Sequence, residues 1–191
     1  MATTRPIIGM ALPQINTNPV DERSERNIKS LHPEVQNLAR SLVHAADKIR
    51  ITIKVISGTR TYEEQHALYL QGRESPEVVN AARKKARMEL IDQKESKKIV
   101  TNADAGHSNH NFEMAFDIGV FEGKNYLGES PLYKAVAVLG KQLGLSWGGD
   151  WKDITDQPHY ELRPQWATSL SEHEMLAELR ARKDSGKSAF A

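Results

Sequence analysis

Histidines and carboxylates from three separate parts of the chain could together hold a metal ion. His107 and His110 lie on a predicted loop, Asp117 follows it, and His159 lies far downstream, three residues after Asp156. Imidazole nitrogens and carboxylate oxygens are good Zn²⁺ ligands, and two histidines with one acid leave a fourth position open for water. Such a site could polarise a carbonyl group and activate water for hydrolysis. Asp156 would be placed to accept the proton of that water.

The segment that carries Asp117 is expected to be a strand with two different faces. The two-residue period divides its residues into Met114, Phe116, Ile118 and Val120 on one face and Ala115, Asp117 and Gly119 on the other. The first set predicts a core face, and the second leaves room beside the carboxylate. A carboxylate in apolar surroundings is costly unless it is paired, hydrogen-bonded or bound to a cation. The alternative is an exposed Asp117 on a solvent face.

The surrounding elements predict an α+β fold, in which a small, mainly antiparallel sheet packs against helices and carries the zinc site on its open face. Apolar periodicity, capping residues and prolines predict helices over 33–50, 61–71, 131–144 and 172–182, a charge-dense helical stretch over 74–98, and strands over 51–56, 114–121 and 159–162. Residues 1–25 are expected to be an extended N-terminal arm, residues 26–185 a single catalytic domain, and the last eight residues a frayed end.

Composition excludes several classes of function. The net charge of +1 predicts no general attraction to nucleic acid, and acidic residues flank both basic clusters. The absence of cysteine excludes disulfides, thiolate catalysis and Cys-containing zinc sites. No stretch approaches the roughly 20 apolar residues of a membrane span. The apolar patch over 6–13 is too short for a signal peptide, so we expect synthesis in the cytoplasm without stable membrane insertion.

Several ordered motifs resemble the LAS group of zinc metallopeptidases, which includes D-Ala-D-Ala carboxypeptidases and the L-alanyl-D-glutamate endopeptidases that tailed phages use as endolysins. The motifs are Ser57-Gly58-Thr59-Arg60-Thr61 with Glu64-Gln65, Ser108-x-His110 with Ala115-x-Asp117, Trp147-Gly148-Gly149-Asp150-Trp151, and Asp156-x-Pro158-His159. The likeness covers roughly residues 30–165. Aspartate rather than glutamate at position 156 resembles the phage branch.

The resemblance implies a role for each matching residue. His110, Asp117 and His159 would hold one Zn²⁺ per chain, and the register with Ser108 selects His110 over His107. Asp156 would be the general base, and Arg60 would stabilise the oxyanion or hold a substrate carboxylate. Ser108 and Gln65 would contact the substrate.

Two features depart from the usual motif. Glu113 stands where the group has glycine, which could change the local turn and bring another carboxylate near the site. The charged stretch 74–98 is longer than the usual link to the metal loop, and we expect it to form a lid or wall over a substrate groove.

The resemblance implies a monomeric phage endolysin that hydrolyses the L-Ala–D-Glu bond of the peptidoglycan stem peptide through a metal-activated water. A holin would release it from the host cytoplasm to the periplasm. The alternatives are a D,D-carboxypeptidase acting on D-Ala-D-Ala ends and, in a different class, a non-catalytic zinc-binding module. The final helix is expected to cap the core, so that removing it lowers stability but spares the metal site; a membrane-disturbing tail is the alternative.

Overall fold

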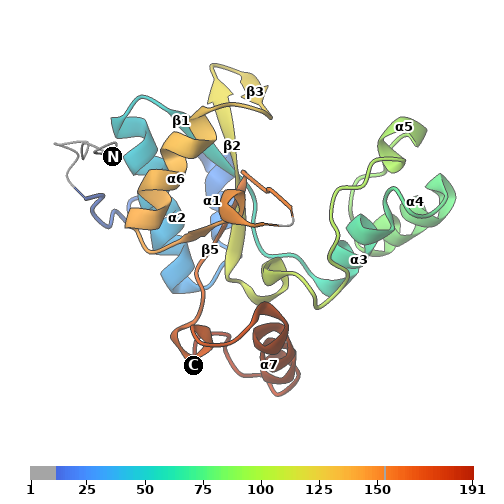
Figure 1. The fold of residues 1–191 in the computed structure, drawn as a ribbon. Helices are drawn as coiled ribbons and strands as arrows, with labels where there is room; N and C mark the ends of the chain where they lie inside the picture. The colour runs from blue at the N-terminus through green and yellow to red at the C-terminus, as the bar shows by residue number, and fades with distance from the viewer. Residues whose placement is uncertain (1–11, 153) are drawn as a thin grey trace, which may run out of the picture.

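The computed structural model describes residues 12–152 and 154–191 and shows an α+β fold (Figure 1). The helices in chain order are α1 (Glu22–Ile28), α2 (Pro33–Lys48), α3 (Tyr62–Leu70), α4 (Pro76–Lys85), α5 (Gln93–Ser96), α6 (Leu132–Gln142) and α7 (Glu172–Asp184). The strands are β1 (Thr52–Ser57), β2 (Ala115–Glu122), β3 (Asn125–Leu127), β4 (Ser146–Trp147) and β5 (His159–Glu161), and 3-10 turns η1 (Asn109–Phe112), η2 (Gly148–Asp150) and η3 (Gln165–Ala167) join them. Across the described residues, no helix combines the length and apolarity needed to cross a bilayer.

The sheet is antiparallel and places β2 at its centre. The strand order is β1-β2-β5-β4, and β3 pairs with the end of β2. The register sets Asp117 opposite His159 on β5 and opposite Ser57 on β1. Residues opposite one another in an antiparallel pair project to the same side, so these three side chains share one face. The expected α+β fold with a small antiparallel sheet is therefore confirmed.

The other face of the sheet packs against helices and forms the main core, as the alternating pattern predicts. Phe116, Ile118 and Val120 are fully buried there, together with residues of α2 and α6. Met114 is also buried, but it belongs to a second cluster with Phe112 and residues of α7. The strand thus uses one face for packing and leaves the face of Asp117 open.

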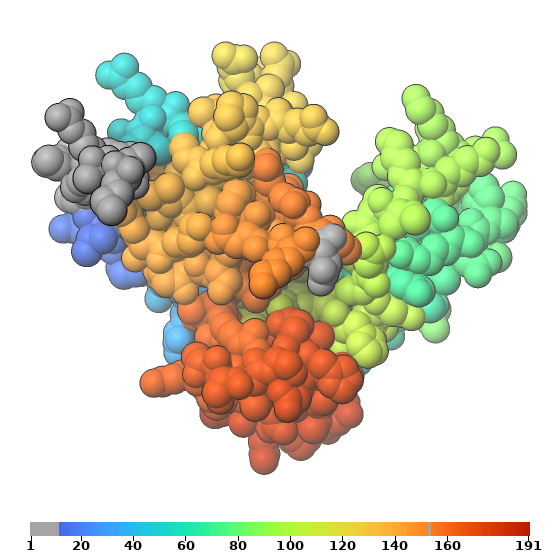
Figure 2. All heavy atoms as spheres, viewed as in Figure 1, coloured from blue at the N-terminus to red at the C-terminus, as the bar shows by residue number. Residues whose placement is uncertain are grey.

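A projecting unit of α3, α4 and α5 stands apart from the sheet on its open side (Figure 1). Figure 2 shows a deep notch between this unit and the body of the molecule. The expectation of one helical stretch over 74–98 is wrong, because α4 ends at Lys85 and only the short α5 follows. Arg87 adopts a left-handed conformation (φ 58°), which breaks the helix.

Both ends of the described chain differ from the sequence-based expectation. Helix α1 begins at Glu22, capped by Asp21, inside the segment expected to be extended; residues 1–11 of that segment lie outside the described residues. The tail after α7 does not fray but folds back, since Trp166 Nε1 donates to Ala189 O (2.8 Å) and the Phe190 ring stacks on His32 (4.3 Å between centroids). Helix α7 itself begins with the capping box that its sequence predicts.

Candidate metal and catalytic site

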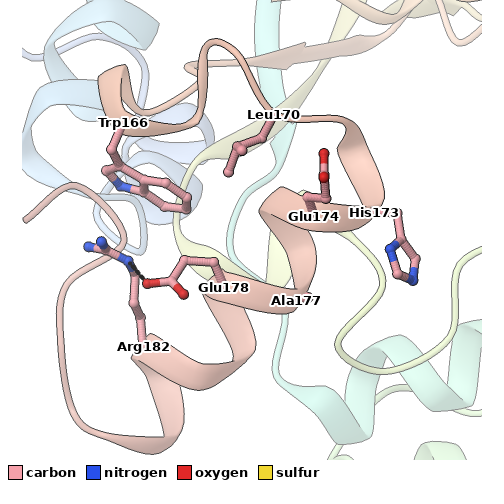
Figure 3. A pocket seen from close by; sticks show the side chains of 7 residues that line it. All are labelled: Trp166, Leu170, His173, Glu174, Ala177, Glu178 and Arg182. Carbon is pink, nitrogen blue, oxygen red and sulfur yellow. Dashed lines mark hydrogen bonds and ion pairs between the residues drawn. The ribbon is translucent and has the colours of Figure 1, made fainter.

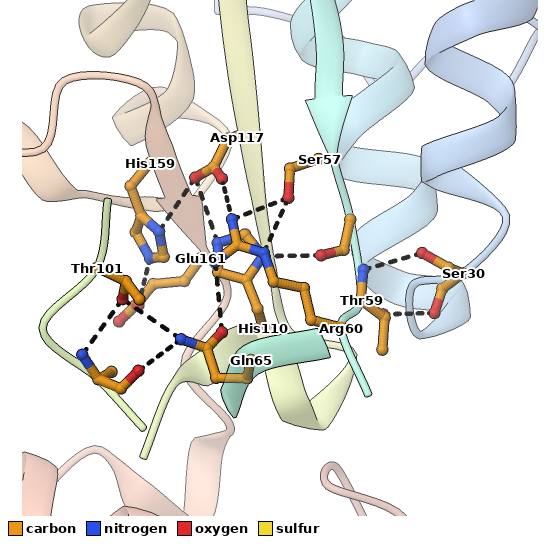
Figure 4. Close-up of polar contacts among 12 residues, drawn as sticks. Ser30, Ser57, Thr59, Arg60, Gln65, Thr101, His110, Asp117, His159 and Glu161 are labelled. Atoms are coloured by element: carbon orange, nitrogen blue, oxygen red, sulfur yellow. Dashed lines mark hydrogen bonds and ion pairs between the residues drawn. The ribbon is translucent and has the colours of Figure 1, made fainter. Parts of the chain in front are cut away.

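Three side chains from three different elements converge at the open face of the sheet (Figure 4). His110 comes from η1, Asp117 from the middle of β2 and His159 from the start of β5. His110 Nε2 lies 3.2 Å from Asp117 Oδ1, and His159 Nδ1 lies 3.4 Å from the same oxygen. One ligand atom of each residue falls within 4.8 Å of the others. The structure thus brings together the three residues that the sequence motif proposes as metal ligands.

Hydrogen bonds fix which nitrogen of each imidazole faces the centre. His110 Nδ1 donates to the carbonyl of Gly58 (2.8 Å), because a carbonyl oxygen can only accept. His159 Nε2 contacts Glu161 Oε2 at 2.9 Å, and an ionised carboxylate likewise accepts. The free lone pair is therefore on Nε2 in neutral His110 and on Nδ1 in neutral His159, the two atoms that point at Asp117. Metal-binding histidines are held in this way by carbonyl and carboxylate groups.

Asp117 presents one satisfied and one unsatisfied oxygen. Its Oδ2 accepts a hydrogen bond of 2.6 Å from Arg60 Nη2. Its Oδ1 is buried and, among the described residues, has no hydrogen-bond partner of acceptable geometry despite the two nearby imidazoles. An unsatisfied buried carboxylate oxygen is costly. Two nitrogen lone pairs and this oxygen form the donor set that Zn²⁺ prefers, so the residues present fit the metal.

The pKa values of His159 and Asp117 also indicate a centre that attracts positive charge, although burial lowers the pKa of His110. Burial lowers the pKa of His159, but the neighbouring carboxylates of Asp117 and Glu161 outweigh this and raise it to about 10. Burial raises the pKa of Asp117, but the neighbouring histidines and Arg60 hold it well below its usual value. A bound Zn²⁺ would take the place of a proton between the carboxylates of Asp117 and Glu161.

Arg60 and Gln65 form a supporting layer behind Asp117. Arg60 donates to Ser57 Oγ through Nε (3.2 Å) and Nη2 (2.9 Å), in addition to its bond with Asp117. Gln65 is fully buried, and its Nε2 donates to Ala103 O at 2.7 Å. This burial does not fit the predicted substrate contact of Gln65. Its amide instead connects Arg60 to the loop that precedes the metal-binding turn.

Asp156 lies beside the three converging side chains without being one of them. Its carboxyl is half-buried, and its pKa is raised by this burial and by the negative charge of Asp117. Gly148 packs against it so closely that an added Cβ would lie 2.5 Å from Asp156 O and 2.9 Å from His159 Cβ. A side chain at position 148 would therefore push the segment carrying Asp156 and His159 away. This close contact fixes Asp156 next to the centre.

Three other residues considered in the sequence have different positions. His107 is exposed, and it is not among the three side chains that converge. Ser108 is half-buried, and its hydroxyl makes no hydrogen bond to any described residue. Glu113 is exposed and adopts the left-handed conformation (φ 63°) that favours glycine, which explains why glycine suits this position in the motif.

Residues that the sequence did not single out connect the centre to α7. Asn109 Nδ2 donates to Glu161 Oε2 (2.7 Å) and to Glu172 Oε1 (2.9 Å). Glu161 could have been found, because it lies two residues after His159 on one strand and so shares its face. Glu172 gives no local signal, because its contact with Asn109 joins residues 63 positions apart.

Helix α7 also binds the backbone on both sides of His110. Arg180 Nη1 donates to Gly106 O, and Lys183 Nζ donates to Asn111 O, each at 3.0 Å. A separate hollow lies on the helix's outer side, where Arg182 sits between Glu178 and Trp166 (Figure 3), and it contains none of the candidate site residues. Because of these inner contacts we now expect, unlike the sequence-based prediction, that losing this helix would affect the metal site.

Comparison with known proteins shows where this arrangement belongs. The profile of the VanY family, described as D-alanyl-D-alanine carboxypeptidase, matches residues 28–161. The peptidoglycan L-alanyl-D-glutamate endopeptidase CwlK of Bacillus subtilis (strain 168) is 34% identical over 146 residues, covering 70% of this chain and 74% of that relative.

Two solved structures resemble the fold. The L-Ala D-Glu endopeptidase ChiX of Serratia marcescens has a TM-score of 0.47 at 22% identity, covering 80% of this chain and 95% of its own. A mutant of the vancomycin resistance D,D-pentapeptidase VanY, solved with Zn(II), has a TM-score of 0.48 at 21% identity, covering 78% and 83%. The two sequence matches span most of the chain and assign it to a family without these structures. The chain belongs to the VanY family of D-alanyl-D-alanine carboxypeptidases and related peptidoglycan peptidases.

Proposed function

We propose that this protein is a zinc-dependent peptidase that hydrolyses the L-Ala–D-Glu bond of the peptidoglycan stem peptide. The observation that carries the proposal is the convergence of two imidazole nitrogens on Asp117 Oδ1, a buried oxygen that has no hydrogen-bond partner in the described part of the chain. The choice of bond is supported by the 34% identity to an endopeptidase of that specificity.

Each residue of the centre has a distinct part in the proposed reaction. His110 Nε2, Asp117 Oδ1 and His159 Nδ1 would hold one Zn²⁺, which when bound polarises the scissile carbonyl and lowers the pKa of water. Asp156 accepts the proton of the attacking water and passes it to the leaving amine; its raised pKa suits a group that must both take and give a proton.

In this proposal the main role of Arg60 is to hold Asp117 in position through its hydrogen bond to Oδ2. Two of its nitrogens are occupied by Ser57 and Asp117, and Nη1 has only a long contact of 3.4 Å with Gln65. One end of the guanidinium therefore remains available to a substrate oxyanion or carboxylate. Ser108, with its free hydroxyl, is a candidate substrate contact.

Mass analysis of peptides released from purified Gram-negative peptidoglycan tests the bond. A new N-terminal D-Glu is expected, whereas free D-Ala would instead assign a D,D-carboxypeptidase, the activity that the family description names. Release of neither product by zinc-loaded protein would favour a non-catalytic zinc module.

We also propose that the enzyme is a monomeric phage endolysin. A holin would release it from the cytoplasm so that it reaches peptidoglycan in the periplasm. The support is the likeness of Asp156-x-Pro158-His159 to the phage branch of the group. Expression in a Gram-negative host should cause lysis only when a holin is co-expressed. Lysis without any holin, or none with one, would contradict this role.

A further inference from the structure

The open face of the sheet continues from Asp117 to a patch of aromatic and basic side chains. Gly119 and Phe121 follow Asp117 on the same side of β2, about 7 and 13 Å along the strand at about 3.3 Å per residue. The register sets Phe121 opposite Tyr126 on β3, and Gly119 opposite Lys54 on β1. This side of the sheet faces the notch in front of the α3–α5 unit (Figures 1 and 2).

Gly119 makes room for two aromatic rings that lie across the strand. A Cβ at this position would come within 2.9 Å of ring carbons of both Phe121 and Tyr126. The two ring centroids lie 5.6 Å apart, and Tyr126 is 51% exposed. The rings therefore lean over Gly119 toward Asp117 and form an accessible apolar surface beside the candidate metal centre.

Two cations flank this aromatic surface. Lys54 Nζ lies 5.5 Å, and Arg23 Cζ 5.8 Å, from the centroid of the Phe121 ring. Among the described residues, neither cation has a carboxylate within 4.0 Å. Their charge is thus available to an anionic ligand that reaches the surface along the open face.

We propose that Arg23, Lys54, Phe121 and Tyr126 form a subsite for the carboxylate-bearing part of the peptide substrate, beyond the bond that is cleaved. The inference rests on the proposed function and extends it along the sheet. An extended peptide needs about four residues to reach from Asp117 to Phe121. In the part of the stem peptide after the cleaved bond, D-Glu has one carboxyl group outside the peptide chain, and the last residue has its terminal carboxylate. The aromatic rings would contact the aliphatic parts of these residues. A neutral sugar would gain nothing from the two cations, which favours the peptide over the glycan strand.

Equilibrium binding to zinc-loaded protein tests the subsite. An Asp156→Asn background prevents turnover, and two N-terminally blocked, fluorescently labelled peptides are compared: one ends at D-Glu, and the other continues for four acidic residues. The long peptide is expected to bind more tightly. Lys54→Glu and Tyr126→Ala should each weaken the long peptide about three- to tenfold, as expected for one exposed ionic or stacking contact, and the short peptide less than about twofold.

Lys134→Glu is the matched control, because Lys134 is exposed on α6, on the far side of the sheet, and the change of charge is the same. Three results would overturn the subsite. Wild-type protein could bind both peptides equally tightly, Lys54→Glu and Tyr126→Ala could weaken both peptides equally, or Lys134→Glu could weaken the long peptide as much as Lys54→Glu does. A peptide-free glycan that binds and loses affinity in Tyr126→Ala would assign the surface to sugar. The cleaved bond is identified separately by mass analysis with Asp156 intact, so a different cleavage product refutes the proposed function without deciding the binding result.

Discussion

At the scale of single residues, the centre separates groups that hold the metal from the group that moves the proton. His110→Ala, Asp117→Ala and His159→Ala are each expected to lose zinc, because each removes one of three protein ligands. His107→Ala should retain zinc, since His107 is exposed and is not one of the three converging side chains. Metal analysis of the four purified variants checks this. Full occupancy in any of the first three would remove that residue from the ligand set.

Asp156→Ala should keep zinc and fold but lose activity. Loss of a general base commonly costs about a hundred- to ten-thousand-fold in rate. The kcat of the variant on a stem peptide, measured beside its zinc content, tests the role. Near-normal turnover would mean that another group takes the proton.

Glu113 carries a conformational cost that glycine would remove. Its left-handed backbone (φ 63°) is unfavourable for a residue with a Cβ. Glu113→Gly should raise the free energy of unfolding by about 0.5–1 kcal/mol, the balance between that relief and the greater entropy of an unfolded glycine. Glu113→Ala keeps the Cβ and should give no such gain in urea unfolding. A loss of activity in both variants would instead indicate that the Glu113 carboxylate takes part in the reaction.

At the scale of elements, α7 is expected to position the metal-binding turn. Glu172 bonds Asn109, which in turn bonds the Glu161 that orients His159. Glu172→Ala should weaken zinc affinity about tenfold or more, the usual effect of removing a group that orients a ligand. Glu174 lies on the same helix but only caps it, so Glu174→Ala should cost about 1 kcal/mol of stability and leave zinc affinity unchanged. Chelator competition, with the visible spectrum of the Co²⁺-loaded protein, measures both. If Glu172→Ala and Glu174→Ala lose zinc affinity equally, α7 stabilises the fold in general and does not position the metal-binding turn.

A second link between elements joins α1 to α2 and should depend on pH. Arg40 donates to both oxygens of Glu25 at 2.9 Å, and their side chains are only 13% and 12% exposed. This bond lowers the pKa of Glu25 below its ordinary value of 4.5. A lowered carboxyl pKa gives stability that is complete above the ordinary value and is lost as the pH falls through the folded one.

Glu25→Gln should therefore destabilise the protein by on the order of 2 kcal/mol at pH 7, and the difference from wild type should shrink below about pH 4.5. Glu22→Gln is the control on the same helix, because the Glu22–Arg26 pair is 89% and 68% exposed and should contribute little. Urea unfolding at several pH values measures this difference in the free energy of unfolding. A difference that stays constant down to pH 3 would exclude the ionisation of Glu25 as its cause.

Elements with local signals could be predicted from the sequence, and those that depend on distant contacts could not. The Thr61–Glu64 and Ser171–Glu174 capping boxes both form as predicted. The break between α4 and α5 depends instead on side chains that bind backbone across it: Arg83 donates to Glu89 O, and Asn80 binds the backbone of Ile91. The metal-site residues could be proposed because motif and strand period agree, whereas Asn109–Glu172 joins segments 63 residues apart.

At the scale of the whole molecule, the sheet body and the α3–α5 unit have very different cores. The body buries side chains from seven helices and strands in one continuous cluster. In the projecting unit, Ala67 and Val79 are the fully buried apolar side chains, whereas Leu90 and Ile99 are 62% and 60% exposed. A small core gives a low free energy of local unfolding. The α3–α5 unit, which forms one wall of the notch, should therefore unfold locally while the sheet stays folded.

Native-state hydrogen exchange should therefore show α4 amides opening at a lower free energy than those of β2. Val79→Ala should lower the opening free energy of α4 by on the order of 2 kcal/mol, through loss of its buried methyl groups, and speed α4 exchange about tenfold or more. Val78 is the neighbouring, 45% exposed residue, so Val78→Ala should leave these rates nearly unchanged. Exchange in β2 should not respond to either change, because α4 contacts α3 and α5 but makes no comparable contact with a strand of the described chain. If Val79→Ala speeds exchange in β2 as much as in α4, the projecting unit and the sheet unfold as one, and the wall of the notch is as rigid as the site that it faces.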